Sequence, residues 1–272
     1  MDSGLARKQP HRRLLPLYLL YASLCCATLL FTVFIERERL QDQFVADAKE
    51  VFRHADVKAK TFEICLDGFA NYLGAQPSLD YDKAQRFAAT IRTSYPELYM
   101  LELAELVHAS ERSSFEAKIR QRGYPNFSIH SFDHSGERIE RPVPDAPYYF
   151  PITFIEPYRD DLATVLGLDL LYSSPELRNA VTDTTLSGRQ QASQPFYLVE
   201  GGLGYLLHHP FRLAEEQQER AYFALAVVRI ADLFTPELLA DPQWRVQVEH
   251  YQKELDISPR WEHTRPLSQR PG

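Results

Sequence analysis

A pair of histidines beside an acid is the first group in the chain that could do chemistry. His130 and His134 flank Asp133, and histidines four residues apart can share a metal when they lie on a helix. This segment instead predicts a strand that enters a turn, where the two side chains need not converge. We therefore interpret both histidines as solvated turn residues and expect no metal site here.

Other groups that resemble functional motifs have simpler explanations. His208 and His209 are adjacent in a predicted strand, so only one ring faces inward, as a satisfied core or pocket histidine. Gly201-Gly202-Leu203-Gly204 lacks the spacing of a phosphate-binding loop and predicts a hairpin turn. Glu262-His263 lies in a proline-rich tail without helical periodicity. No Ser-His-Asp or Cys-His set has a recognisable motif, so we expect no catalysis and no cofactor in this chain.

The stretch from Tyr148 to Arg212 carries short blocks in a characteristic order. The blocks are Tyr149-Phe150-Pro151-Ile152 with Glu156-Pro157; Leu166-Gly167-Leu168-Asp169; Arg178 leading to Ser187-Gly188; and Pro195-Phe196 followed by Leu203-Gly204. Together they resemble the CHASE domain, the extracytoplasmic sensor module of plant cytokinin receptors and of many bacterial signalling proteins. The resemblance covers roughly Tyr81 to Phe234. It implies PAS-like lobes on a long stalk helix and the binding of a small molecule.

The resemblance also implies where the ligand binds. In the plant receptors a carboxylate two residues before the Tyr-x-Pro block holds the adenine, and the matching position here is Pro147. Asp145, the nearest acid, is out of register by two residues, so we expect cytokinins to bind weakly and another small molecule to bind instead. Two further plant pocket positions fall on Thr182 and Ser193, which offer hydroxyl groups. The predicted ligand-binding residues are Asp145, Tyr148, Tyr149, Thr153, Thr182 and Ser193.

An uncharged run from Leu14 to Phe34 predicts a transmembrane helix. Twenty-one residues at 1.5 Å per residue make a helix roughly 30 Å long, which matches the bilayer core. Basic residues precede the run, so the N-terminus is expected in the cytoplasm and the chain from Glu36 onward outside. This places an anchor in the inner membrane and an ectodomain in the periplasm. A secretory signal is the alternative, but no small-x-small cleavage site follows the run.

Charge and cysteine content limit the partners of the ectodomain. The net charge of −7 argues against binding to nucleic acid. Of the three cysteines, Cys25 and Cys26 lie in the apolar run and Cys65 is alone outside it. A single cysteine makes no internal disulfide, so the ectodomain is expected to be stabilised by packing alone.

Apolar residues recur at steps of three and four after the membrane segment, which predicts one long amphipathic helix. They are Phe44, Ala48, Val51, Ala55, Ala59, Phe62, Leu66, Phe69 and Leu73. Two interpretations of this stripe remain open. The stripe packs on its own domain, or it pairs with a second subunit in a homodimer, and both can hold along different turns.

Beyond this helix the pattern predicts an α+β fold, with an antiparallel sheet and interspersed helices. Predicted helices follow Asp80, cover Ser113 to Arg122, and cover Pro175 to Leu186 between Ser173 or Ser174 and Gly188. Predicted strands cover Phe127 to Phe132, Tyr148 to Ile155, Phe196 to Glu200, Tyr205 to His209 and Tyr222 to Val228. The state of Leu98 to Val107 is ambiguous.

The expected organisation has five parts. They are a basic cytoplasmic N-terminus (1–13), a transmembrane helix (14–34), a stalk helix (35–76), a CHASE-like sensor domain (77–235) and a membrane-proximal tail (236–272). We expect a sensor that binds a small molecule and transmits a signal across the membrane. Two alternatives remain: the regulatory half of a diguanylate cyclase or histidine kinase, and a stand-alone anchored binding protein. The chain itself is not expected to be an enzyme.

Overall fold

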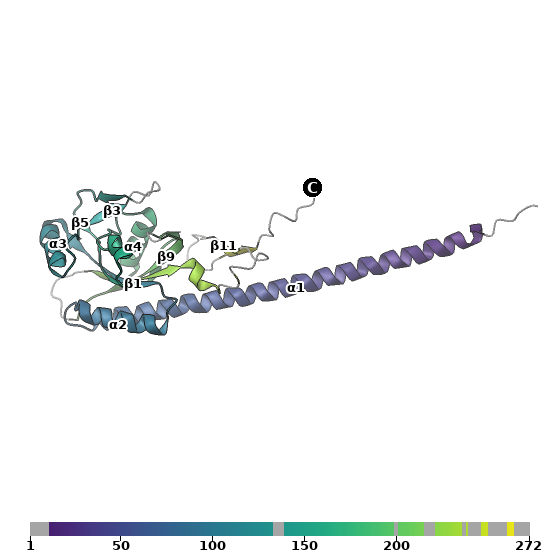
Figure 1. The fold of residues 1–272 in the computed structure, drawn as a ribbon, viewed down its shortest axis with the longest axis horizontal. Coiled ribbons are helices and arrows are strands. Elements are labelled where there is room, and N and C mark those ends of the chain that lie inside the picture. The colour runs from purple at the N-terminus through teal and green to yellow at the C-terminus, as the bar shows by residue number, and fades with distance from the viewer. Residues whose placement is uncertain are drawn as a thin grey trace, which may run out of the picture. The chain divides into compact units, whose positions relative to one another are not determined.

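A computed structural model of the chain describes residues 11–132, 139–198, 201–214, 221–235, 238, 246–249 and 260–263 (Figure 1). The chain divides into two compact units, residues 1–53 and 54–272, and each is described by itself. Several predicted features lie outside the described residues: the turn at His134, the strand end at Glu200, most of the N-terminal segment and most of the tail.

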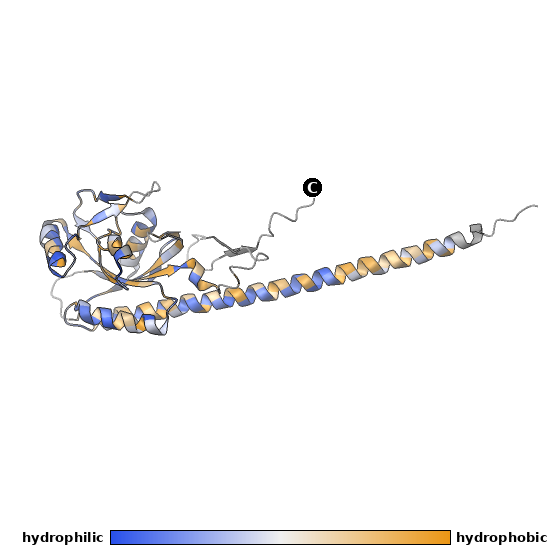
Figure 2. Cartoon of the chain, viewed as in Figure 1, coloured by the Kyte–Doolittle hydropathy of each residue, from blue (hydrophilic) through white to orange (hydrophobic). Residues whose placement is uncertain are grey.

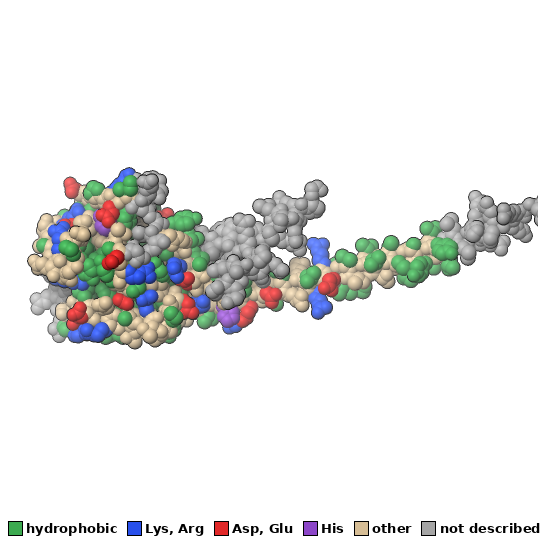
Figure 3. Space-filling model, in the orientation of Figure 1, with side chains coloured by type: hydrophobic (Ala, Val, Ile, Leu, Met, Phe, Trp, Pro, Cys, Tyr) green, Lys and Arg blue, Asp and Glu red, His purple; other side chains and the backbone are tan. Residues whose placement is uncertain are grey.

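Helix α1 (His11–Gly74) runs without interruption through the predicted membrane and stalk segments. Its N-terminal part is the one stretch, within the described residues, that is long and apolar enough to cross a membrane. Its large apolar side chains from Leu17 to Ile35 are exposed. Figures 2 and 3 show apolar residues along this stretch and charged residues directly after it. The structure confirms a long N-terminal apolar helix.

Local capping signals in the sequence mark the ends of two further helices, as predicted. Asp80 accepts a hydrogen bond of 3.1 Å from a backbone N–H in the first turn of α2 (Tyr81–Ser94). Ser174 caps α4 (Pro175–Ser187) in the same way, at 3.2 Å. Gly188 then ends α4 in the left-handed conformation, which favours glycine.

Six strands form one antiparallel sheet in the second unit. In spatial order they are β6 (Ile152–Glu156), β1 (Met100–Glu105), β10 (Tyr222–Arg229), β9 (Leu203–Phe211) and β7 (Gln191–Ala192), and β8 (Phe196–Tyr197) pairs with β9. The segment of ambiguous sequence pattern is thus a central strand. β1 and β10 pair from Met100 opposite Val227 to Glu105 opposite Tyr222. The mixed helix and antiparallel sheet confirm the predicted fold class.

Shorter elements connect the sheet and the helices. The two-stranded pairs are β2 (Val107–His108) with β5 (Tyr148–Tyr149), β3 (His130–Phe132) with β4 (Glu140–Pro142), and β11 (Val246–Glu249) with β12 (Arg260–His263). The remaining helices are α3 (Arg112–Gln121), η1 (Ala109–Glu111), η2 (Asp160–Val165) and η3 (Ile230–Leu233).

One face of the sheet is covered by α2 and the C-terminal turns of α1 (Figure 1). The ring of Phe69 in α1 lies 6.5 Å from that of Phe154 in β6 and 6.3 Å from that of Phe87 in α2. The buried members of the apolar stripe are Ala55, Phe62, Leu66, Phe69 and Leu73. Along these turns the stripe packs on its own domain, which is the first of the two interpretations.

The opposite face of the sheet is covered by α3, α4 and the loops around them. Phe150 and Phe223 pack there with ring centroids 4.6 Å apart. Leu177 and Val181 of α4 and Ile119 of α3 belong to the same apolar cluster. Every residue of β1, and all but the last of β10, is buried. The central strands therefore contact packed side chains on both faces, and any polar group on them must find a partner inside the protein.

Four local predictions differ from the structure. The strand predicted over Phe196 to Glu200 ends at Tyr197, as β8. The predicted strand Phe127–Phe132 begins only at His130, because the residues before it form a turn in which Phe127 N–H donates to Tyr124. The predicted strand Tyr148–Ile155 is two strands, β5 and β6. His130 is buried rather than solvated, with its ring nitrogens each 2.9 Å from a backbone oxygen.

Replacing Phe62 with Lys is expected to destabilise the second unit by about 3 kcal/mol or more, because an unpaired charge would be buried. The Phe62 side chain is 2% exposed, whereas Val57 on the same helix is 52% exposed and provides the matched control. Val57→Lys should change stability by less than about 0.5 kcal/mol. Denaturant unfolding of the full chain in detergent, followed by circular dichroism, measures both. Equal stability of the two variants would contradict the packing of the stripe on the sheet.

Candidate functional site

The sheet face beneath α4 carries two buried polar side chains in one row. His208 on β9 pairs with Leu225 on β10, and Leu225 pairs in turn with Glu102 on β1. Residues directly opposite each other in antiparallel strands project to the same face. Glu102 is 1% exposed and His208 is fully buried. Neighbouring strands are about 4.8 Å apart, so the backbones of the two polar residues are about 10 Å apart, with Leu225 between them.

The desolvation of His208 is offset only in part, by an interaction of its ring with the backbone of Leu206. Neither ring nitrogen has a hydrogen-bond partner among the described residues, and the ring stands edge-on to Phe223 at 6.2 Å between centroids. Burial lowers the pKa of His208 to about 4, and the backbone of Leu206 opposes this shift. The imidazole is therefore uncharged at neutral pH, with one N–H donor and one acceptor nitrogen.

Thr184 is a second unpartnered group, on the helix that covers this face. Its side chain is fully buried, and its hydroxyl has no hydrogen-bond partner within the described part of the chain. Helix α4 packs against β9 and β7, and Gln191 of β7 pairs with His208. Thr184 therefore lies on the buried face of α4, toward the strand that carries His208.

Asp169 holds the loop that joins the sheet edge to α4. Its carboxylate accepts hydrogen bonds from the backbone N–H groups of Phe150 at 2.7 Å, Leu171 at 2.8 Å and Tyr172 at 3.0 Å. Burial raises the pKa of Asp169 to about 6, while the three donors act in the opposite direction. With these bonds made to backbone on both sides of the loop, we interpret Asp169 as a structural residue.

Gly167, two residues earlier, is required by a close backbone approach. It has φ +97°, and a Cβ atom there would lie 2.2 Å from the carbonyl oxygen of Ser128. The Gly167 N–H donates to Ile152, and its carbonyl accepts from His130. The Leu166–Asp169 block therefore links β6 to β3 through backbone hydrogen bonds. This close approach explains why the block has glycine at position 167.

Tyr149 is a buried member of the predicted site with polar contacts to three residues. The guanidinium of Arg112 lies 4.8 Å from the centroid of its ring, a cation–π contact. Its hydroxyl donates to the carbonyl of Pro144 at 3.3 Å and accepts from the N–H of Ala146 at 3.2 Å. Tyr149 thus fixes the segment that contains Asp145, whose own side chain is exposed.

The other predicted residues are spread over separate parts of the second unit. Tyr148 is 46% exposed. Thr182 is exposed on α4, and its hydroxyl donates to a carbonyl of its own helix at 2.9 Å. Thr153 is fully buried and donates to the carbonyl of Leu103 at 3.4 Å.

Ser193 is buried at the edge of the sheet, and its hydroxyl continues the strand pairing. Its side-chain oxygen accepts from the N–H of Leu206 at 3.0 Å and donates to the carbonyl of Gln194 at 2.9 Å. Its own N–H donates to the carbonyl of Leu206 at 2.8 Å. The structure brings Tyr149 to the α4 side of the unit but does not gather the six predicted residues around one point.

Sequence reasoning did not single out Glu102 or Thr184 as functional, and it assigned His208 a satisfied role. The alternation of the predicted strand Tyr205–His209 was a usable signal, because it already placed one of two histidines inside. It gave no indication that the buried ring has no hydrogen-bond partner. Among the described residues, no group of three or more His, Cys, Asp or Glu side chains has the arrangement of a metal site.

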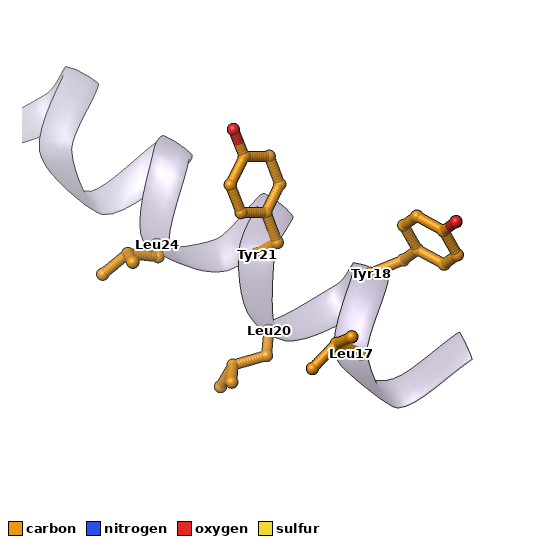
Figure 4. A pocket seen from close by; sticks show the side chains of 5 residues that line it. All are labelled: Leu17, Tyr18, Leu20, Tyr21 and Leu24. Atoms are coloured by element: carbon orange, nitrogen blue, oxygen red, sulfur yellow. The ribbon is translucent and has the colours of Figure 1, made fainter. Parts of the chain in front are cut away.

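A shallow apolar hollow also lies on α1, between Leu17, Tyr18, Leu20, Tyr21 and Leu24. Figure 4 shows these five side chains projecting from successive turns of the same helix. All its walls come from one exposed helix in the apolar stretch. The hollow is therefore a surface suited to lipid or to a neighbouring helix, and not a pocket for a polar ligand.

Comparison with known families gives one match, which covers most of the second unit. Residues 77–258 match the family described as CHASE domain. No protein with a curated description matches the chain.

Three solved structures are similar to this chain. An extracellular ligand-binding receptor from Desulfohalobium retbaense has a TM-score of 0.42 and 12% identity, over 68% of this chain and 25% of that one. The ligand-binding domain of the Pseudomonas aeruginosa amino-acid chemoreceptor PctC, in complex with GABA, has a TM-score of 0.29 and 14% identity, over 64% of this chain and 55% of that one. Methyl-accepting chemotaxis protein X has a TM-score of 0.30 and 15% identity, over 67% of this chain and 64% of that one. The chain thus spans less than two thirds of each.

The raised pKa of Asp169 predicts how stability depends on pH. A folded-state pKa of about 6, against 3.8 ordinarily, means that the folded chain binds this proton more tightly than the unfolded chain. Stability should therefore fall as pH rises from about 4 to about 6, by up to about 3 kcal/mol from this group. Asp169→Asn should remove that component of the slope, whereas Asp145→Asn, at an exposed position, should retain it. Denaturant midpoints between pH 4 and 7 measure the slopes, and identical slopes in both variants would refute the assignment.

Proposed function

The chain belongs to the CHASE domain family, and from this we propose that it is a membrane-anchored sensor. Its second unit binds a small molecule outside the membrane, and α1 transmits the binding event. The family match over residues 77–258 carries the proposal, since CHASE is a sensor domain. Catalysis is not assigned to this chain.

The continuity of α1 supports a direct route for the signal. The same unbroken helix contains the apolar stretch and, after it, the turns that pack on the sheet. Phe69 contacts Phe154 of β6, so a shift of the sheet alters the packing of the helix. A ligand drives such a shift only if it binds one arrangement of the sheet and helix more tightly than the other.

The orientation follows from the charges that flank the apolar stretch. Arg7, Lys8, Arg12 and Arg13 precede it, which places the N-terminus in the cytoplasm. The anchor then lies in the inner membrane, and the sensor unit lies in the periplasm.

A homodimer through the stalk is the arrangement that we propose for signalling. In the part of α1 before the sensor unit, Leu40, Phe44 and Val45 are 57%, 40% and 42% exposed. A second copy of the same helix would cover these apolar side chains in the manner of a coiled coil. The predicted stripe would then pack on its own domain from Ala55 onward and on the partner before it.

The ligand is expected to differ from the cytokinins of the plant receptors. Pro147 stands where those receptors have a carboxylate, and its carbonyl accepts the N–H of Ala109 at 2.9 Å. Loss of a charge-assisted hydrogen bond weakens binding by roughly ten- to a hundredfold. The exposed carboxylate of Asp145, two residues before Pro147, is the acid nearest to this position in the sequence.

A thermal-shift panel on the full chain in detergent tests whether it is a sensor. Purines, amino acids, carboxylates, sugars and amines are compared at millimolar concentration. We expect at least one non-purine compound to raise the melting temperature, and adenine-type cytokinins to leave it unchanged. Tight cytokinin binding that disappears in Asp145→Ala would overturn the ligand expectation, and the absence of any stabilising compound would count against the sensor itself.

Reporter fusions test the orientation. A reporter enzyme that is active only in the periplasm, joined after Gly272, should be active when the full chain is expressed in a bacterium with two membranes. A cytoplasmic reporter at the same place should be inactive. The reverse pattern would show that the proposed orientation is wrong.

A further inference from the structure

We propose that His209 and Asp67 form a pH-sensitive contact that fastens α1 to the sheet when the imidazole is charged. The ring nitrogen Nε2 of His209 lies 3.0 Å from a carboxylate oxygen of Asp67. His209 belongs to β9 and Asp67 to α1, 142 residues apart in the sequence. The inference adds an input to the proposed sensor function, on which its role rests, but the contact itself can be tested without a ligand.

The first argument is that both ring nitrogens of His209 face atoms that only accept hydrogen bonds. Nε2 faces the carboxylate of Asp67, and Nδ1 lies 3.0 Å from the carbonyl oxygen of Pro210. A neutral imidazole has one N–H and can donate to one of these oxygens, whereas an imidazolium has two and donates to both. Loss of the proton therefore removes one hydrogen bond, and it also removes the charge that attracts the carboxylate.

The second argument is the position of the contact, on the face of the sheet that carries α1. One row of directly opposed residues runs from His209 on β9, through β10 and β1, to Phe154 on β6. Residues opposed in this way project to the same face of the sheet. Phe154 packs against Phe69 of α1. Helix α1 therefore contacts both ends of the row, through Asp67 at one end and through Phe69 at the other.

The third argument is that the pair is open to solvent protons. The side chain of His209 is 19% exposed and that of Asp67 is 57% exposed. Histidine is the side chain whose charge ordinarily changes between about pH 5 and pH 8. The contact can therefore respond to the pH of the surroundings while the rest of the unit stays folded.

The neighbouring titratable groups on this face must be separated from the pair. On α1 the acid one turn before Asp67 is Glu63, and burial raises its pKa. On β9, burial and then the charge of Glu63 raise the pKa of Tyr205, which stays neutral where histidine titrates. On β10, the residue opposite His209 is Ala224, which carries no charge. A pH response of this region therefore comes from the histidine pair or from Glu63.

A double-mutant cycle at two pH values isolates the pair. The melting temperature of the ligand-free full chain in detergent at low salt is measured for the wild type, His209→Gln, Asp67→Asn and the double variant. The coupling between the two changes should be about 1–3 °C near pH 5.5. It should fall to half or less near pH 8, because a contact with the charged histidine is lost as pH rises. Glu63 is present in all four proteins, so its own titration cancels.

Equal coupling at the two pH values, or no coupling near pH 5.5, would overturn the proposal. His108→Gln is the matched control for the histidine, since His108 is exposed on β2, and it should show no coupling to Asp67→Asn at either pH. Lys58→Gln removes a different contact of α1, the hydrogen bond of 3.1 Å to the carbonyl of Asp232. Lysine does not ordinarily titrate in this range, so this variant should retain the pH dependence of the wild type.

Hydrogen–deuterium exchange tests whether the contact fastens α1. After correction for the intrinsic effect of pH on exchange, the turns of α1 around Asp67 should be about twofold to fivefold less protected near pH 8 than near pH 5.5. In His209→Gln the protection should be the same at both pH values. Wild-type protection that does not change with pH would overturn the role of the contact. Both measurements use the ligand-free chain, so a negative result here leaves the sensor function to be decided by the compound panel.

Discussion

The pairing of β1 with β10 is the interaction on which the rest of the second unit depends. It joins the first and last strands of the sheet at its centre, in register over the whole length of β1. The elements between these strands in the sequence therefore either extend the sheet on its two sides, as β6 and β9 do, or pack on one of its faces. The helices that precede β1 cover one face, and α3 and α4, which follow it, cover the opposite face. The two central strands are consequently buried on both sides, and their polar residues are enclosed.

The two faces of the sheet carry different contacts. On the α1 side Phe69 packs between Phe154 and Phe87, and polar contacts such as that of Tyr81 with Glu105 lie beside them. On the α4 side the same strands carry Glu102 and His208, opposite the helix that carries Thr184. The C-terminal turns of α1, the helix that contains the candidate membrane span, pack on the first face. The two faces share one set of strands, so in the proposed sensor a ligand on the α4 face would act on α1 through a single layer of backbone.

Much of the fold could be predicted from local signals. Asp80, Ser174 and Gly188 determine helix ends through bonds within a few residues, and the steps of three and four in α1 reflect its packed face. The turn at Gly201 and Gly202 was also predictable, because glycine readily adopts the positive φ that both residues have. Such features need no knowledge of distant residues.

The candidate site could not be predicted in the same way, because it depends on how α4 is rotated against the sheet. Thr182 and Thr184 are two residues apart, which turns their side chains by about 200° around the helix. Sequence resemblance selected Thr182, yet packing exposes it and buries Thr184. Ser193 offers a hydroxyl in the sequence, but strand pairing with Leu206 engages it. The unpartnered ring of His208 arises from contacts among β9, β10 and α4, which no local pattern specifies.

Hydrogen–deuterium exchange of the full chain, with and without a stabilising compound from the thermal-shift panel, tests the central claim that the two faces of the sheet are coupled. Binding beneath α4 should slow amide exchange in β9 and α4 and, in the same experiment, change exchange in the turns of α1 between residues 54 and 74. Protection that is confined to other elements, or that leaves those turns of α1 unchanged, would contradict it.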